Sequence, residues 1–385
     1  MRTLYAHTFE MDDFEVAIAE IHAQLDLANN QRANTLGILA CHKEFVRTGA
    51  AQAICKSLPF EVIGSVTTTQ AVPGQEGDLI LTLLVLTSDE ERFSTALTDT
   101  LNGPWAQSIE DGYKKAAAAL PGAPALALIL TPFMVQNSGD AYVDVLTRVS
   151  GGVPCFGTMS IDNSNTFADC FVLCGGEAYI DRMAIALVHG DIHPRFFLAT
   201  ISKEKILPQS ALITSSDGHL LKEVNGRPVI EYFTKLNLVD ASQTSYAMAS
   251  LPFVVDYNDG TPPVSKVFIS LDEEQHAICA GAMPEGSTLY LGVFDKQDVL
   301  LTTRTAVEQA LAETNPSVML IYSCIARSIS LGGEVMVELE TVQDALGTRC
   351  PFMMAYSGGE FCPTQVRGDK AINRFHNNSF ILCAF

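Results

Sequence analysis

One order of short segments recurs three times along the chain. Each copy starts with an apolar run typical of a buried strand and stops at small polar residues. A helix-like segment follows, then a strand that is led by proline and ends at a glycine-polar turn, and an apolar strand closes the copy. The copies start at residues 36–40, 125–130 and 318–322. This alternation predicts a mixed α/β (α+β) fold in which helices cover the sheets.

The spacing of the strands also indicates the kind of sheet and the division into domains. Several strands follow each other without a helix between them, which favours mixed sheets over purely parallel ones. A Ser/Thr-containing stretch at residues 205–218 separates the second copy from the third, and we expect a domain boundary there. We therefore predict two domains, residues 1–205 and 206–385, built from repeated strand–helix–strand units. Residues 89–119 are expected to be helical.

Composition limits the classes of partner. Apolar residues make up 48% of the chain and charged residues 18%, so a large core is available. Lys and Arg total 24 against 44 for Asp and Glu, a net charge of −20. Such a charge repels phosphate backbones and anionic lipid, so we expect neither nucleic acid nor a membrane surface as partner. The N-terminus resembles no secretion signal and the apolar runs are short, which favours the cytoplasm.

Cofactor and metal motifs are missing from the sequence. The ten cysteines include no C-x-x-C pair and lie mostly in apolar strands, as expected of free thiols in a reducing compartment. His189 and His193 have a spacing that suits a metal on a helix, but Gly190 and Pro194 argue against a helix there. No phosphate-binding loop or dinucleotide fingerprint occurs. We therefore predict no cofactor and no metal.

Candidate site residues follow the predicted strands. In sheets of this kind, the loops after the strand C-termini line the ligand crevice. Glycine in such turns lets the backbone come close to a bound group. The strand stops and glycine-polar turns in question are Cys41-His42, Thr131-Pro132, Cys324, Gly64-Ser65, Gly157-Thr158 and Gly358-Gly359.

Cys324 is the most interesting thiol. It ends a predicted strand three residues before Arg327, whose charge would favour the thiolate if it points inward. One interpretation is a ligand contact, and a bolder one is a nucleophile with His376 as its base. The alternative is a buried cysteine beside a surface arginine.

Glu360 and a group of basic residues complete the C-terminal candidates. Glu360 directly follows Gly358-Gly359 and is either a hydrogen-bonding carboxylate over a glycine turn or a solvated charge. Arg367, Lys370, Arg374 and His376 form a basic island that could clamp a carboxylate or phosphate, or could be an ordinary solvated loop. If a site exists, Cys324 and Glu360 should lie on neighbouring strand ends of one crevice.

Together these motifs resemble a known family. Gly64-Ser65-Val66-Thr67-Thr68-Thr69-Gln70 and Gly157-Thr158-Met159-Ser160-Ile161-Asp162 are similar to the turns of the N-terminal FIST domain. Four further motifs resemble those of the C-terminal FIST domain: Glu223-Val224-Asn225-Gly226, Ser323-Cys324-x-x-Arg327, Gly359-Glu360 and His376-Asn377-x-Ser379. Thr69-Gln70 departs from the Gly-Glu of that family's first turn, and Ser379 replaces threonine.

The resemblance implies a sensory module of prokaryotic signal transduction that binds small molecules such as amino acids, without enzymatic activity. We expect a small anionic or zwitterionic ligand, and a separate signalling protein that supplies the output. The expected ligand-binding residues are Cys324, Arg327, Gly359, Glu360, His376 and Asn377, with Thr67 and Asp162 facing in from the N-terminal half.

Two other hypotheses stay open at this point. A thiol-dependent enzyme would use Cys324 with His376 and would show one fast-reacting cysteine. An interaction module would use an exposed apolar surface to bind a signalling partner or a second copy of the chain, which would make a homo-oligomer.

Overall fold

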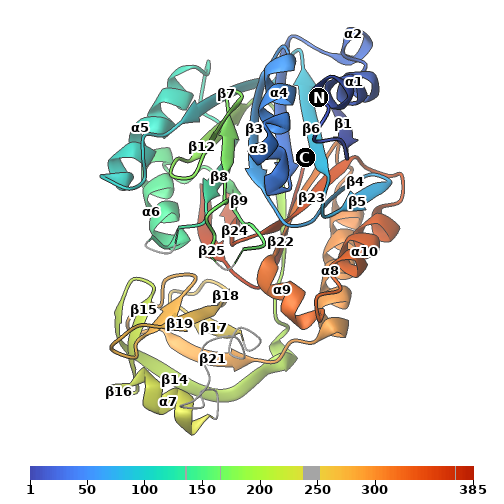
Figure 1. Cartoon of the computed structure of the whole chain (residues 1–385). Helices are drawn as coiled ribbons and strands as arrows, with labels where there is room; N and C mark the ends of the chain where they lie inside the picture. The colour runs from blue at the N-terminus through green and yellow to red at the C-terminus, as the bar shows by residue number, and fades with distance from the viewer. Residues whose placement is uncertain (135–136, 165, 237–251, 369) are drawn as a thin grey trace.

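Three similar units and one inserted domain make up the protein (Figure 1). The computed structural model describes all residues except 135–136, 165, 237–251 and 369. The mixed α/β class is as predicted: helices lie against sheets that contain both parallel and antiparallel pairs. Among the described residues, no helix has both the length and the apolar character needed to cross a membrane.

Each unit repeats one order: an edge strand, a helix, a strand, one or two helices, a parallel strand, a hairpin and a closing strand. Unit 1 comprises β1 (Arg2–Thr8), α1 (Phe14–Leu25), the short α2 (Leu27–Asn30), β2 (Asn34–Cys41), α3 (Lys43–Thr48), α4 (Ala50–Ser57), β3 (Glu61–Val66), β4 (Gln70–Val72), β5 (Gln75–Gly77) and β6 (Leu81–Ser88). Unit 2 comprises β7 (Arg92–Leu97), α5 (Trp105–Ala118), β8 (Leu126–Pro132), α6 (Gly139–Ser150), β9 (Cys155–Ser160), β10 (Val172–Cys174), β11 (Glu177–Tyr179) and β12 (Ala184–His189).

Unit 3 is interrupted after its first strand. It comprises β13 (Arg195–Ala199), α8 (Lys296–Glu313), β22 (Met319–Cys324), α9 (Ile325–Ser330), α10 (Met336–Leu346), β23 (Phe352–Ser357), β24 (Glu360–Arg367), β25 (Lys370–His376) and β26 (Phe380–Ala384). The interruption is the insertion domain, which follows a short 3-10 turn (Lys203–Lys205). It comprises β14 (Ile206–Asp217), β15 (Leu220–Val224), β16 (Arg227–Pro228), α7 (Val229–Lys235), β17 (Phe253–Asp256), β18 (Val264–Lys266), β19 (Phe268–Leu271), β20 (Ala277–Cys279) and β21 (Thr288–Gly292).

The structure corrects one expected helix. Residues 92–97 form β7, an edge strand that pairs antiparallel with β12, and α5 begins only at Trp105. The predicted boundary between residues 205 and 206 coincides with the start of β14, but β13 before it pairs with β26 after it. The division into residues 1–205 and 206–385 therefore stays a prediction.

The hairpins are exchanged between units. Each six-stranded sheet takes four strands from one unit and two from another. The hairpin β10–β11 of unit 2 pairs with β3 of unit 1, β24–β25 of unit 3 pairs with β9 of unit 2, and β4–β5 of unit 1 pairs with β23 of unit 3. The exchange is cyclic, so each unit completes the sheet of one neighbour and receives a hairpin from the other.

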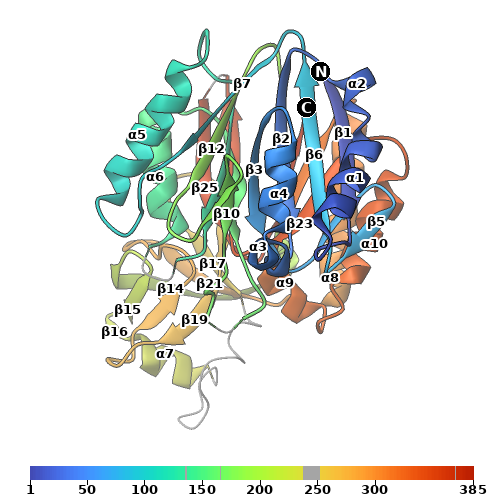
Figure 2. The same ribbon diagram turned by 45° about the horizontal axis from the view of Figure 1, so that its top comes forward.

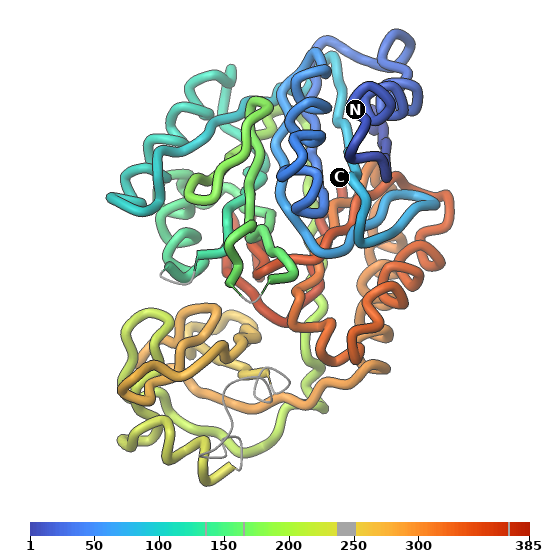
Figure 3. The backbone as a smooth tube through the Cα atoms, viewed as in Figure 1, coloured from blue at the N-terminus to red at the C-terminus, as the bar shows by residue number. Residues whose placement is uncertain are grey.

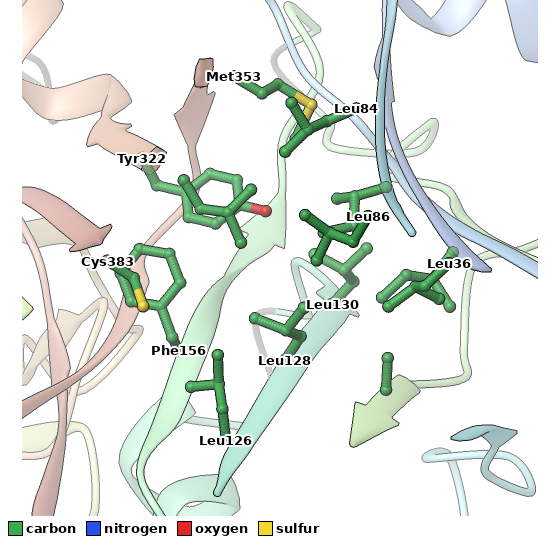
Figure 4. Close-up of a cluster of buried hydrophobic side chains, with 14 of the residues drawn as sticks. Leu36, Leu84, Leu86, Leu126, Leu128, Leu130, Phe156, Tyr322, Met353 and Cys383 are labelled. Carbon is green, nitrogen blue, oxygen red and sulfur yellow. The ribbon is translucent and has the colours of Figure 1, made fainter. Parts of the chain in front are cut away.

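The three sheets face one another around a common apolar core. Their inner faces contribute Leu36 and Leu84 of unit 1, Phe156 of unit 2, and Tyr322 and Cys383 of unit 3 (Figure 4). Helices cover the outer faces, with α1 and α4 on unit 1, α5 and α6 on unit 2, and α8 and α10 on unit 3 (Figure 2). Burial on both faces explains why β6, all of whose residues are buried, contains the continuous apolar run at residues 83–86.

We predict that Gly157→Ala destabilises the fold by about 3 kcal/mol. Gly157 of β9 pairs in parallel with Ile129 of β8, and an added Cβ would lie 1.8 Å from the Ile129 carbonyl oxygen. Urea unfolding measures the loss. Gly103→Ala is the control, because no atom lies within 4 Å of its added Cβ. Equal stability of the two variants would contradict this account of the contact.

Candidate functional site

The carboxyl ends of β3, β9 and β23 are joined in a ring of hydrogen bonds. Each unit accepts one bond from another: Ile161 N–H to Val66 O (3.1 Å), Gly358 N–H to Met159 O (2.9 Å) and Thr67 Oγ1 to Tyr356 O (2.7 Å). The structure corrects two of the three expected glycine-polar turns, because Gly64-Ser65 lies within β3 and Gly157-Thr158 within β9, whereas Gly358-Gly359 lies between β23 and β24. The strand ends that follow these glycines are nevertheless gathered at one end of the three-unit body.

Three positions in this ring are equivalent. The backbone N–H groups of Val66, Met159 and Tyr356 donate to the carbonyls of the residues immediately before the exchanged hairpins, which are Phe171, Gly359 and Thr69. The residues that follow those carbonyls are Val172, Glu360 and Gln70. A carboxylate therefore stands at this position in the hairpin of unit 3, where the other two hairpins carry an apolar side chain and an amide. The Thr69-Gln70 departure from the family motif falls at this position.

Glu360 is fully buried at the start of β24, where it pairs with Thr158 of β9 and with His376 of β25. Its Oε2 accepts a hydrogen bond of 2.7 Å from Ser379 Oγ, and its Oε1 has no partner among the described residues. Burial raises the pKa of Glu360 to about 8, although the hydrogen bond from Ser379 and the nearby Ser357 and Cys324 oppose the rise. The carboxyl group therefore holds its proton at neutral pH.

Cys324 lies beside Glu360, as the sequence predicted. It is the last residue of β22, is 2% exposed, and donates its backbone N–H to Ser379 O at 2.9 Å. Burial and the neighbouring Glu360 raise the pKa of the Cys324 thiol well above its usual value. The expectation that Arg327 would favour a thiolate is therefore wrong: the environment favours the neutral thiol.

Arg327 is neither a surface residue nor a partner of the thiol. Its side chain is fully buried and forms an ion pair of 2.8 Å with Glu338 of α10. Its Nη2 also donates to Thr303 Oγ1 and to Val299 O, while Nη1 has no partner among the described residues. Packing of the guanidinium over the ring of Phe294, 5.3 Å from its centroid, completes the enclosure.

Glu338 is the residue that the sequence analysis missed. It accepts hydrogen bonds from Ser323 Oγ (2.8 Å) and from Tyr356 OH (2.6 Å) in addition to Arg327. Burial alone would raise its pKa, but Arg327 and the hydroxyl donors bring the pKa of Glu338 below its usual value. A signal was present, because Glu338 lies four residues before the buried Val342 and hence on the apolar face of the helix.

His376 is neutral and is not placed to act as a base for Cys324. Its Nε2 lies 3.0 Å from Cys362 O, so this nitrogen carries the proton. Burial lowers the pKa of His376 to about 4. Among the described residues no hydrogen bond joins His376 to Cys324. Together with the raised thiol pKa, this geometry does not favour the thiol-dependent enzyme.

Asn377 is 1% exposed, and neither its Oδ1 nor its Nδ2 has a partner among the described residues. Gly359 lies next to it, since an added Cβ there would stand 3.1 Å from Asn377 Nδ2 and 2.1 Å from the Phe375 ring. With φ of 150° as well, this position accepts only glycine. The structure thus brings Cys324, Glu360 and Asn377 together around the Gly359 turn.

The two N-terminal candidates, Thr67 and Asp162, form hydrogen bonds to backbone groups. Thr67 Oγ1 donates to Tyr356 O in the ring described above. Asp162 accepts from the N–H groups of Ser164 and Asp169, both at 2.8 Å, and so holds its own loop. Of the basic island, Arg374 pairs with Asp259 of the insertion domain and lies over the ring of Tyr257, rather than forming part of an anion clamp with Arg367.

Comparison with known proteins identifies the family. The FIST N domain matches residues 35–227 and the FIST C domain matches residues 231–363. The chain belongs to the FIST family. FIST domains are generally associated with sensory roles in signal transduction. No curated protein matches the chain. Among solved structures, the match to PurLQS from Thermotoga maritima covers 99% of this FIST chain and 71% of the PurLQS chain, at 9% sequence identity. Its TM-score of 0.19 is too low to indicate a shared fold.

We predict that Glu360 makes the fold less stable as the pH rises. The unfolded carboxyl group, with a pKa of 4.5, is ionised where the folded one, with a pKa of about 8, still holds its proton, so the unfolded state binds fewer protons. Between pH 6.5 and 8 the natural protein should lose about 2 kcal/mol relative to Glu360→Gln. His376, with a pKa of 6.5 unfolded and about 4 folded, contributes the same slope to both proteins and therefore cancels from this comparison.

Urea unfolding of both proteins across this pH range measures the difference. Glu340→Gln is the control, because it makes the same substitution at an exposed glutamate of α10. The control should follow the natural profile. Parallel profiles for Glu360→Gln and the natural protein would show that the buried carboxyl group does not hold its proton.

Proposed function

We propose that the protein is a sensory module that binds a small zwitterionic metabolite, of the amino-acid type, at the buried polar site of unit 3. One observation carries the proposal: polar atoms of three buried side chains of unit 3 have no hydrogen-bond partner among the described residues. These atoms are Glu360 Oε1, both amide atoms of Asn377, and Arg327 Nη1. Buried polar groups of this kind are ordinarily satisfied, so a ligand that supplies the missing partners would stabilise the folded state.

The chemistry of the unpartnered atoms supports the ligand class. Arg327 Nη1 is a cationic donor, which suits a carboxylate. Glu360 Oε1 is an acceptor, and an ammonium group beside it would favour the ionised carboxylate over the protonated form. Arg327 is close enough to lower the pKa of Glu360 slightly, so one small molecule could reach both groups. The Asn377 amide adds two N–H donors and a carbonyl acceptor beside Gly359, the residue before Glu360.

Cys324 would contact the ligand as a neutral thiol, next to Glu360, and Gly359 would let the ligand approach the backbone. His376 would position Asn377 without donating to the ligand, since its Nε2 is occupied by Cys362 O. Thr67 and Asp162 would hold the surrounding turns. In this proposal the protein acts in the cytoplasm, and a signalling protein or a second copy of the chain receives the output, because both matched domains are sensory ones.

We predict that an L-amino acid raises the melting temperature of the natural protein in a saturable way. A ligand at 100 times its Kd stabilises the folded state by about 2.7 kcal/mol. Asn377→Ala should remove most of this shift while changing the stability of the free protein by less than about 1 kcal/mol, because its amide makes no hydrogen bond among the described residues. Differential scanning fluorimetry with the common amino acids measures both effects.

Glu360→Gln should also abolish the shift, and the exposed Glu340→Gln should keep it. Amines without a carboxylate and carboxylates without an amine are the ligand controls, and each should bind more weakly. No stabilisation by any of these compounds at millimolar concentration, or an equal shift in Asn377→Ala, would overturn the proposal.

A further inference from the structure

The site around Glu360 is closed to solvent. Cys324 is 2% exposed, Asn377 is 1% exposed and Glu360 is fully buried. A ligand that reaches the unpartnered atoms of Glu360 and Asn377 can do so only after part of the surrounding structure moves. The question is therefore which element covers the site and what holds that element in place.

The insertion domain, defined as the described residues between Ile206 and Gly292, contacts the site through β18. Ser265 O accepts a hydrogen bond of 3.1 Å from Asn377 N–H. The next residue, Lys266, donates from Nζ to Phe375 O at 2.8 Å. These two contacts fall on either side of His376, so β18 lies directly over the end of β25 that carries the site.

Lys266 also anchors the insertion domain to unit 2. Its fully buried ammonium group contacts both carboxylate oxygens of Asp140, at 2.8 and 2.9 Å. Asp140 lies in the first turn of α6 and accepts two more hydrogen bonds from the insertion domain, from Ala282 N–H (2.6 Å) and Tyr257 OH (3.3 Å). A buried cation of this kind depends on its partner, because removing one member of the pair leaves an uncompensated charge.

The chain connections of the insertion domain lie on the other side. Residues 200–205 lead into β14 and residues 293–295 lead out to α8, and both run past α8 and α9 (Figures 1 and 3). The Lys266–Asp140 contact, by contrast, joins the insertion domain to α6 and β25. An apolar cluster packs around these connections; its members are Ile201, Val254, Phe294, Val299 and Leu331. Apolar packing at the connections and an ion pair at the far edge are the parts of a hinged closure.

We propose that the insertion domain is a hinged lid over the Glu360 site and that the Lys266–Asp140 ion pair is its latch. The lid rotates about the apolar cluster at its two chain connections. When the latch breaks and the lid opens, the hydrogen bond from Asn377 N–H to Ser265 O is also lost. Asn377 therefore belongs to the ligand site and also contacts the lid. A ligand that binds the Asn377 side chain with the lid closed shifts the lid toward its closed position, which is how binding becomes a change of shape.

The ligand step rests on the proposed function, but the lid itself can be tested without any ligand. Cys324 is the reporter, because it lies next to Glu360 and donates its backbone N–H to Ser379 O, two residues after the Asn377 that β18 contacts. The experiment measures the rate at which iodoacetamide alkylates each cysteine of the folded full-length protein, by mass spectrometry of its peptides. Cys155, which is fully buried in β9 of unit 2, is the internal reference for general unfolding.

We predict that Lys266→Met and Asp140→Asn each raise the alkylation rate of Cys324 at least about tenfold, because local opening becomes easier than unfolding. The Cys155 rate should stay unchanged. Asp259→Asn is the matched control: it removes the same charge from another ion pair across this interface, but Asp259 and Arg374 are partly exposed, so a change of less than about twofold is expected.

Two outcomes would overturn the lid. The first is a Cys324 rate that stays at the natural value in both latch variants. The second is a rise of Cys155 and Cys324 together in Asp140→Asn, the milder variant, which would mean that the contact stabilises the whole fold and closes no site. A ligand screen that fails while Cys324 becomes reactive only in the latch variants would reject the proposed function and leave the lid standing.

Discussion

The hairpins β4–β5, β10–β11 and β24–β25 leave their own units and pair with β23, β3 and β9. Because the exchange is cyclic, removing one unit would leave a second unit's sheet without its outer strands and the third unit's hairpin without a sheet to pair with, and unpaired backbone groups are costly when buried. The inner faces of all three sheets also share one apolar core. Three similar units therefore fold as one body, and their strand ends are forced to meet at one place.

That meeting place decides where the chemistry lies. The same exchange that brings Glu360 onto β9 also puts it beside Cys324 at the end of β22, which belongs to its own unit but to a different sheet. Equivalent positions in the other hairpins carry Gln70 and Val172. Of the three equivalent hairpin positions, only that of unit 3 therefore carries an acidic residue, and we call the surroundings of Glu360 and Cys324 the acidic corner. The insertion domain enters between β13 and α8 of the same unit, and so it is attached next to the corner that it covers.

Buried charge is treated in two ways at this corner. Arg327 and the hydroxyl donors Thr303, Ser323 and Tyr356 surround the Glu338 carboxylate, so it stays ionised although it is fully buried. Glu360 has hydroxyl and thiol neighbours but no cation in contact among the described residues, and it keeps its proton instead. The first arrangement fixes the structure, whereas the second leaves hydrogen-bonding capacity that a bound molecule could use.

The sequence by itself determined the repeating units, because apolar runs, proline-led strands and glycine turns are local signals. It also placed Cys324 and Glu360 at strand ends that would meet, and Gly359 at a turn that excludes a side chain. It failed for residues 92–97, where an edge strand with one exposed side lacks a continuous apolar run. It missed Glu338 as the partner of Arg327, because that pairing joins two helices through a buried contact that no local pattern specifies. The exchange of hairpins, the neutral state of Glu360 and the position of the insertion domain over the site were decided only by tertiary structure, since each depends on groups from distant parts of the chain that share one dehydrated space.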